Sequence, residues 1–155
     1  MFDVVALGEL LIDFTPAGLT PAGMRLFEQN PGGATANVAV ALAKLGAHCA
    51  FVGKVGADMH GDFLRAVLNE RGIDTSGLIS DSGVFTTLAF VSLSEKGERG
   101  FSFARKPGAD TCLKPEELRP DVLEQCKIFH FGSLSLTDEP SRAATLAALN
   151  TAKKA

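Results

Sequence analysis

The sequence predicts an α/β fold with a Rossmann-type, mostly parallel sheet flanked by helices. The first observation is a set of short, continuous apolar runs at residues 4–8, 49–53 and 127–132, which is typical of strands buried on both faces of a parallel sheet. The second is that helical patterns at residues 34–45 and 59–71 stand between these runs. Strand, helix and strand in this order form a βαβ unit, whose crossover is right-handed.

Composition places the chain among globular proteins. Its 155 residues are 46% hydrophobic and 21% charged, which is ordinary for a domain that buries a core. A formal net charge of -3 without a basic block argues against a nucleic-acid partner, and no apolar run reaches the roughly 18 residues of a membrane helix. Three widely spaced cysteines and an apolar N-terminus without a basic segment predict a reduced cytoplasmic protein. The histidines and cysteines have no spacing typical of metal ligands.

Local patterns predict the remaining elements. Asp58 is expected to cap the helix at 59–71, and residues 15–23 are a loop by composition. Pro120 is expected to interrupt a helix within residues 115–125, because proline cannot continue the helical hydrogen-bond ladder. The last two expected elements are a short strand at 24–29 and a helix at 142–154, where the pattern stops.

Residues 31–46 contain the most informative pattern, a glycine turn that opens an apolar helix. Gly32 and Gly33 can adopt positive φ angles and let a ligand approach the backbone. The first N–H groups of the helix lack intrahelical partners, so they suit a hydroxyl, a carboxylate or a phosphate. Asn37 lies one turn in, where its amide can donate and accept. The alternative is that the glycines only allow tight packing on the sheet, with Asn37 a solvated surface residue.

Asp13 follows the first strand closely, after the apolar residues 10–12. Open α/β sheets bind ligands at the carboxyl edge of their strands, so Asp13 is a candidate acceptor for a ligand hydroxyl. A turn or helix-capping aspartate is the alternative. Ser133 stands at the carboxyl end of the third apolar strand.

The middle of the chain has strand patterns that are not interleaved with helices, at residues 78–80, 85–93 and 99–105. A hairpin turn is expected at residues 95–98 between the last two. Residues from about 15 to 30 and from about 78 to 110 are therefore expected to form a small antiparallel β-lid over a ligand. A decorative hairpin or a dimer contact is the alternative.

Four groups of residues carry a resemblance to a known family. They are residues 7–13; Gly32 and Gly33 followed by Asn37, Ala39, Gly46 and Gly56; residues 55–58 with Gly61, Phe63 and Leu64; and residues 86–91 with residues 103–110. On these motifs the whole chain resembles the amino-terminal half of the ribokinase-like (PfkB) carbohydrate kinases, most closely the bacterial fructokinase branch.

The resemblance implies a kinase that binds a sugar at the carboxyl edge of the sheet, closes the β-lid over it and transfers the γ-phosphoryl group of Mg-ATP to a primary hydroxyl. The implied cofactors are ATP and Mg²⁺, and the implied partner is a small sugar, with a homodimer through the β-lid left open. By the same resemblance Arg105, on the lid side, contacts the substrate or the transferring phosphate. The implied sugar-binding residues are Asp13, Gly32, Gly33, Asn37, Arg105 and Ser133.

Two departures from the family pattern bear on this interpretation. Thr35 stands where the fructokinase branch usually has proline. The start of a helix tolerates threonine at a small cost in propensity. The family's second signature, a Gly-Ala-Gly-Asp turn that supplies the general base and an anion hole, is absent: residues 56–58 lack the second glycine, and residues 107–110 fall in the lid region. We therefore expect an incomplete carboxyl half, no catalytic base and little of the nucleotide site in this chain, and negligible activity of the isolated chain.

Three other functions stay open at this point. A kinase of the same family for ribose, a nucleoside or 2-keto-3-deoxygluconate would share these motifs. A non-catalytic sugar-binding module would share the fold without the reaction. A dinucleotide-binding domain is the third alternative and ranks last. The glycine pair follows a long loop rather than the first strand, and no G-x-G-x-x-G occurs.

Overall fold

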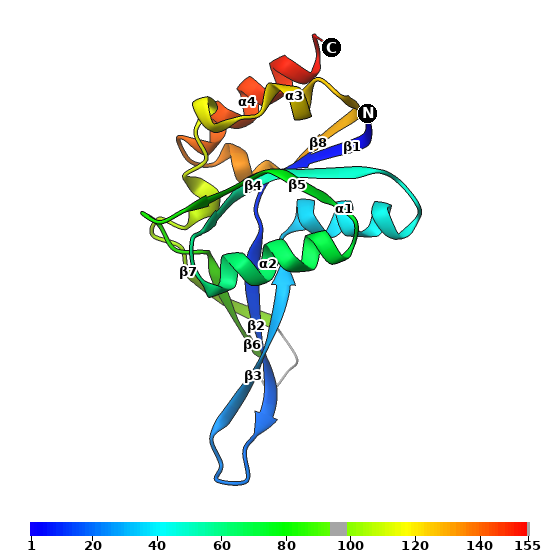
Figure 1. Ribbon diagram of the computed structural model, residues 1–155. Helices are drawn as coiled ribbons and strands as arrows, with labels where there is room; N and C mark the ends of the chain where they lie inside the picture. Colours follow the sequence, from blue (N-terminus) through cyan, green and yellow to red (C-terminus); the bar gives the residue numbers. More distant parts are fainter. Residues whose placement is uncertain (94–98, 155) are drawn as a thin grey trace.

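The structure, a computed structural model, describes residues 1–93 and 99–154. It contains two sheets: a main sheet covered by helices and an outer sheet that extends away from it (Figure 1). The hairpin turn expected at residues 95–98 lies outside the described residues.

The main sheet consists of parallel strands β1 (Phe2–Leu7), β4 (Cys49–Gly56), β5 (Asp74–Asp81) and β8 (Cys126–Phe131). Their order is β5-β4-β1-β8. In the central pair, Val5 of β1 lies beside Ala50 of β4, and Leu7 beside Val52. These residues are buried because helices cover both faces of the sheet, which explains the continuous apolar sequence of the two strands.

Helices on one face of the main sheet are α1 (Ala34–Lys44) and α2 (Met59–Glu70), and those on the opposite face are α3 (Pro120–Leu123) and α4 (Ser141–Ala152) (Figure 1). Each face has its own apolar core. Phe51 and Leu64 belong to the core under α1 and α2, whereas Leu123 and Ala148 belong to the core under α3 and α4. The carboxyl edge of the sheet is left for the outer sheet and the connecting turns.

The outer sheet consists of β2 (Leu11–Leu19), β3 (Arg25–Gly32), β6 (Leu88–Leu93) and β7 (Arg99–Ala104). Two antiparallel hairpins, β2 with β3 and β6 with β7, join through parallel pairing of β2 with β6. The Phe14 ring packs edge-on against the His60 ring of α2, with ring centroids 5.9 Å apart. Since successive residues of a strand point to opposite faces, Asp13 points away from α2.

Buried Lys54 of β4 ties the main sheet to the segments that enter and follow the outer sheet. Its Nζ lies 3.0 Å from Asp81 Oδ2 at the end of β5 and 2.6 Å from Glu117 Oε1. Burial alone would lower the pKa of Lys54, but its hydrogen bonds to the two carboxylates outweigh this and raise it. This ion cluster fixes the end of β5, from which the chain continues to β6.

Two strand expectations need correction. Residues 78–80 belong to β5 in the main sheet rather than to the lid, because β5 pairs in parallel with β4. Residues 15–19 are strand rather than loop, since β2 continues through Pro16, which pairs with Phe27 of β3. Pro16 lies beyond the stretch of β2 that pairs with β6, so its missing N–H breaks no bond on that side.

The helix expected within residues 115–125 is a 3₁₀ turn at Pro115–Glu117 followed by the short α3. The two pieces separate just before Pro120, as the chemistry of proline predicts. The expected caps and ends of α2 are confirmed, with Asp58 as its N-cap.

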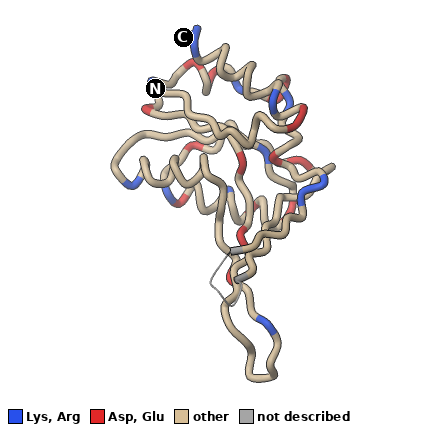
Figure 2. The backbone as a smooth tube through the Cα atoms, turned by 180° about the vertical axis from the view of Figure 1, so that it is seen from behind, with Lys and Arg blue, Asp and Glu red and all other residues tan. Residues whose placement is uncertain are grey.

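Charged residues are spread along the chain in the body of the molecule and are sparse along the outer sheet (Figure 2). The outer sheet instead exposes aromatic side chains, among them Phe27 and Phe90, which are 43% and 40% exposed. In the described part of the chain, no helix has the length and apolar character needed to cross a membrane.

Candidate functional site

The turn between β3 and α1 brings two glycines against polar groups of other segments. Gly33 is the N-cap of α1 with a φ of 116°, a value that residues with a side chain rarely adopt. A Cβ at Gly33 would collide with the main-chain oxygen of Glu9, and a Cβ at Gly32 would collide with the Asp13 carboxylate. The backbone therefore requires glycine at position 33, whereas a side chain at position 32 would displace the Asp13 carboxylate.

Asp13 is a half-buried strand residue whose carboxylate lies over Gly32. Its partner across the β2–β3 ladder is Asn30, whose amide donates to Thr15 instead. Burial raises the pKa of Asp13, and no hydrogen bond from the described residues offsets this effect. The carboxylate is therefore free to accept hydrogen bonds from a ligand.

Asn37 lies in the first turn of α1, where its backbone N–H donates to the Gly33 carbonyl over 2.9 Å. Its side chain is exposed and, together with Gly32, lines a cavity of about 90 Å³ between α1 and α2. Gly32 thus adjoins both residues at the start of α1: the Asp13 carboxylate lies against it, and Asn37 lines the same cavity as Gly32. These three residues and Gly33 are called the glycine-turn site below.

From the sequence we expected the first amide of α1 to be free for a ligand, but in the structure it is not. Ala34 N donates to Glu9 Oε1 over 2.8 Å, and Thr35 Oγ1 donates to the Glu9 carbonyl over 3.4 Å. A carboxylate of the protein itself occupies this positive helix end, which disfavours a second anion there. The site therefore suits hydroxyl groups better than a phosphate.

Arg105 follows β7 and is held by Asp110. Its Nε and Nη2 donate to Asp110 Oδ2 over 2.9 and 2.6 Å, and Thr87 Oγ1 donates to Asp110 Oδ1. Burial would lower the pKa of Arg105, but the bonds to Asp110 and the negative charges of Asp110, Asp138 and Glu9 raise it. The guanidinium is therefore permanently charged and fixed in orientation.

Asp58 has a structural environment. It accepts hydrogen bonds from the backbone N–H groups of His60 and Gly61 and from both the N–H and the hydroxyl of Thr86. Burial alone would raise the pKa of Asp58, but these bonds outweigh it and lower the pKa. With its acceptor positions occupied, Asp58 joins α2 to the segment that leads into β6.

Ser133 is the exposed first residue of a 3₁₀ turn after β8, Ser133–Leu136. No hydrogen bond within the described residues joins Ser133 or Arg105 to the glycine turn. Sequence reasoning missed Glu9, which contacts the turn directly. The available signal was an acidic residue between two apolar runs, a position that has to be buried and therefore needs a partner.

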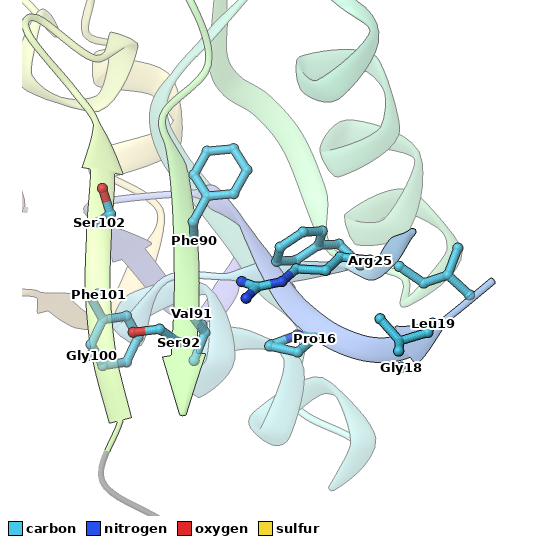
Figure 3. A pocket seen from close by; sticks show the side chains of 12 residues that line it. Pro16, Gly18, Leu19, Arg25, Phe90, Val91, Ser92, Gly100, Phe101 and Ser102 are labelled. Carbon is cyan, nitrogen blue, oxygen red and sulfur yellow. The ribbon is translucent and has the colours of Figure 1, made fainter. Parts of the chain in front are cut away.

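A second hollow, of about 580 Å³, lies on the outer sheet and contains none of the expected site residues. Figure 3 shows the side chains of Pro16, Arg25 and Phe90 bordering it from three strands. Phe90 pairs with Phe14, so it points to the face opposite Asp13. This hollow is separate from the glycine-turn site.

A parallel sheet with a polar, glycine-lined site at its carboxyl edge defines the class of α/β proteins that bind small molecules at that edge. Residues 1–155 match the model of the pfkB family carbohydrate kinases. The chain belongs to this family, which confirms the resemblance seen in the sequence.

Relatives give a consistent result. The chain is 47% identical to a probable fructokinase-4 of Arabidopsis thaliana, over 98% of this chain and 47% of that protein. A fructokinase from Xylella fastidiosa has a TM-score of 0.92 at 41% identity, over 99% of this chain and 48% of that one, and it has also been solved with bound ATP. An aminoimidazole riboside kinase from Salmonella enterica has a TM-score of 0.80 at 32% identity, over 97% and 46%. The chain spans about half the length of these relatives.

Proposed function

We propose that this chain provides the sugar-binding part of an ATP-dependent fructose kinase. The observation that carries the proposal is the glycine-turn site, where the side chains of Asp13 and Asn37 adjoin Gly32 and have no hydrogen-bond partner among the described residues. A carboxylate and an amide that both adjoin one glycine suit a neutral polyol, because the carboxylate accepts hydrogen bonds from hydroxyls and the amide both accepts and donates them. The named fructokinases that match nearly all of this chain support fructose as the sugar.

In the proposed reaction Asp13 accepts a hydrogen bond from one sugar hydroxyl, and Asn37 orients another. Arg105, held by Asp110, is the cation of this region that would meet the transferring phosphoryl group. Phosphoryl transfer depends mainly on positioning and on stabilisation of charge. This chain would thus contribute substrate positioning and one cationic contact.

The general base of the reaction is not assigned within the described residues. Asp58 is saturated with hydrogen bonds, and Asp110 is paired with Arg105. ATP and Mg²⁺ belong to the proposed reaction, but no group of three His, Cys, Asp or Glu side chains in the described residues is arranged to hold a metal ion. Mg²⁺ in kinases is held largely by substrate phosphates.

The outer sheet would act as the lid over the sugar and as the contact between two copies of the chain. Its Asp13-bearing face adjoins the glycine turn, and its other face exposes Phe27 and Phe90. A cytoplasmic location of the kinase would be consistent with its three free cysteines, Cys49, Cys112 and Cys126, because the cytoplasm keeps thiols reduced.

The test is ADP release from ATP with fructose, measured on the kinase that contains this chain and on the chain 1–155 alone. The expected result is fructose-dependent release from the kinase and negligible release from residues 1–155. Ribose, a nucleoside and 2-keto-3-deoxygluconate are assayed in parallel. A higher kcat/KM for one of these would replace fructose as the substrate, and absence of activity with all four would refute the proposal.

A further inference from the structure

Glu9 is a buried acidic residue that the proposed reaction does not use. Its relative exposure is 6%, and it stands in the short connection between β1 and β2. Burying a carboxylate is costly unless hydrogen bonds and opposite charge compensate. Glu9 therefore needs compensating contacts within the fold.

The first of these contacts of Glu9 lies at the start of α1. Glu9 Oε1 accepts the Ala34 amide, and the Glu9 carbonyl accepts the Thr35 hydroxyl and touches Gly33. Glu9 thus contacts three consecutive residues of the turn. The negative charge also lies at the positive end of the α1 dipole.

The other oxygen of Glu9 points elsewhere. Oε2 is buried and has no hydrogen-bond partner among the described residues. It lies beside Gly132, where a Cβ would be 3.2 Å from Oε2 and 3.0 Å from Thr35 Cγ2. Gly132 directly follows β8 and is the N-cap of the 3₁₀ turn that begins at Ser133. The carboxylate therefore fills the space between the glycine turn and the turn that carries Ser133.

We propose that Glu9 is a positioning residue that holds these two turns at the spacing needed to bind the sugar. One oxygen fixes the start of α1, and hence Gly33 and Asn37, while the other sets how closely Gly132 approaches. Glu9 itself does not touch the substrate. This inference rests on the proposed sugar kinase function and adds to it a residue that controls the affinity for sugar.

The first test compares Glu9→Ala with Glu9→Gln in the kinase that contains this chain. Glu9→Ala is expected to raise KM for fructose about tenfold, with KM for ATP changed less than about twofold, because only the sugar side loses its spacing. Glu9→Gln keeps an acceptor for Ala34 and is expected to stay within about threefold of wild type. Hydrogen exchange over residues 31–40 should accelerate in Glu9→Ala only.

A matched control is Glu139→Ala. Glu139 is an exposed glutamate whose Oε2 accepts the Ala143 amide near the start of α4 over 3.1 Å. It is expected to change thermal stability slightly and KM for fructose not at all. If Glu9→Ala does not fold, Glu9→Asp takes its place, since the shorter side chain cannot reach Ala34.

The second test approaches Glu9 from the other side. Gly132→Ala brings a methyl group against Oε2 and is expected to raise KM for fructose about threefold in wild type but by a smaller factor in Glu9→Ala, where only its contact with Thr35 Cγ2 remains. Additive effects, or a Glu9→Ala variant that loses thermal stability with both KM values unchanged, would overturn the inference. A wild-type enzyme inactive on all sugars would refute the proposed function instead.

Discussion

Helices α1 and α2, on one face of the main sheet, differ in how their N-termini are capped. The start of α2 is closed by its own residue, Asp58, whose carboxylate accepts four hydrogen bonds. The start of α1 has a glycine N-cap without a side chain, and its first amide is satisfied by Glu9 from another segment. Beside it, the carboxylate of Asp13 has no donor among the described residues.

The difference separates stability from binding. At α2 the polar groups satisfy one another, which lowers the pKa of Asp58 despite burial and joins helix to strand. At α1 burial raises the pKa of Asp13, and no hydrogen bond from the described residues opposes this effect. Polar groups that a fold positions but leaves unpaired are available to a ligand, and those at α1 are the ones we assign to sugar binding.

Gly33→Ala should have the largest effect. A side chain there is strained at a φ of 116° and collides with the Glu9 carbonyl, so the turn has to move. We expect kcat/KM for fructose to fall more than about 100-fold, since small displacements of positioning groups cost that much. The matched control is Gly46→Ala after α1, with a φ of 90° and open space around it. It should cost only about 1–2 kcal/mol of stability, and equal losses of activity in both variants would contradict the account.

Asp13→Ala should be next. Loss of a hydrogen bond to a charged group is worth about 1.5–3 kcal/mol, so KM for fructose should rise about 10- to 150-fold with KM for ATP nearly unchanged. Asp58→Ala should do the reverse: unfolding free energy falls by about 1–2 kcal/mol through loss of the N-cap, while KM for fructose changes less than about twofold. Steady-state kinetics and thermal melts decide. A larger KM change in Asp58→Ala than in Asp13→Ala would reverse the assignment.

Titration should sharpen the same contrast with a smaller effect. Because the pKa of Asp13 is raised, its carboxylate is lost as pH falls through a value above the ordinary aspartate pKa of about 3.9. Because the pKa of Asp58 is lowered, its contribution to stability is present above the ordinary value and is lost only as pH falls through the lower folded pKa.

Fructose affinity should therefore weaken as pH falls through the raised pKa of Asp13, while Asp58 is still ionised and circular dichroism still reports a folded protein. Isothermal titration across pH measures this, and Asp13→Asn should remove the dependence. Parallel loss of affinity and of folded signal would show that the two carboxylates are not distinguished in this way.

The smallest effect on the reaction should come from the outer sheet. Phe27→Ser is expected to shift the kinase from dimer toward monomer in sedimentation equilibrium, because it removes an aromatic surface from the proposed contact between two copies. KM for fructose should change less than about twofold. Phe85→Ser, at a residue that is 81% exposed outside the outer sheet, is the control and should leave the mass unchanged. A monomeric wild-type enzyme at micromolar concentration would end this part of the account.

Much of the fold follows from local sequence. The apolar run at residues 4–8 has to be buried on both faces, and Gly33 opens a helix because of its own conformational freedom. Residues 78–80 could not be assigned to the right sheet in this way, since a strand of this length fits either sheet and only its pairing with β4 decides. The strand through Pro16 was missed for the same reason: proline reads as a loop unless the free edge is known.

The site was partly predictable. Asp13 and Asn37 could be placed because one follows a buried strand and the other follows the glycine turn. Glu9 could not, since its hydrogen bond reaches Ala34 across 25 positions of the chain, and no local pattern encodes that contact. Likewise, the resemblance implied only a contact of Arg105 with the substrate or the phosphate, and its ion pair with Asp110 is seen only in the fold.

The most direct test of sugar binding at the start of α1 is a crystal structure of the kinase that contains this chain, soaked with fructose. We expect fructose hydroxyls within hydrogen-bond distance of the Asp13 carboxylate and the Asn37 amide, above Gly32. Fructose bound instead in the hollow bordered by Pro16, Arg25 and Phe90, or anywhere away from Asp13, would contradict it.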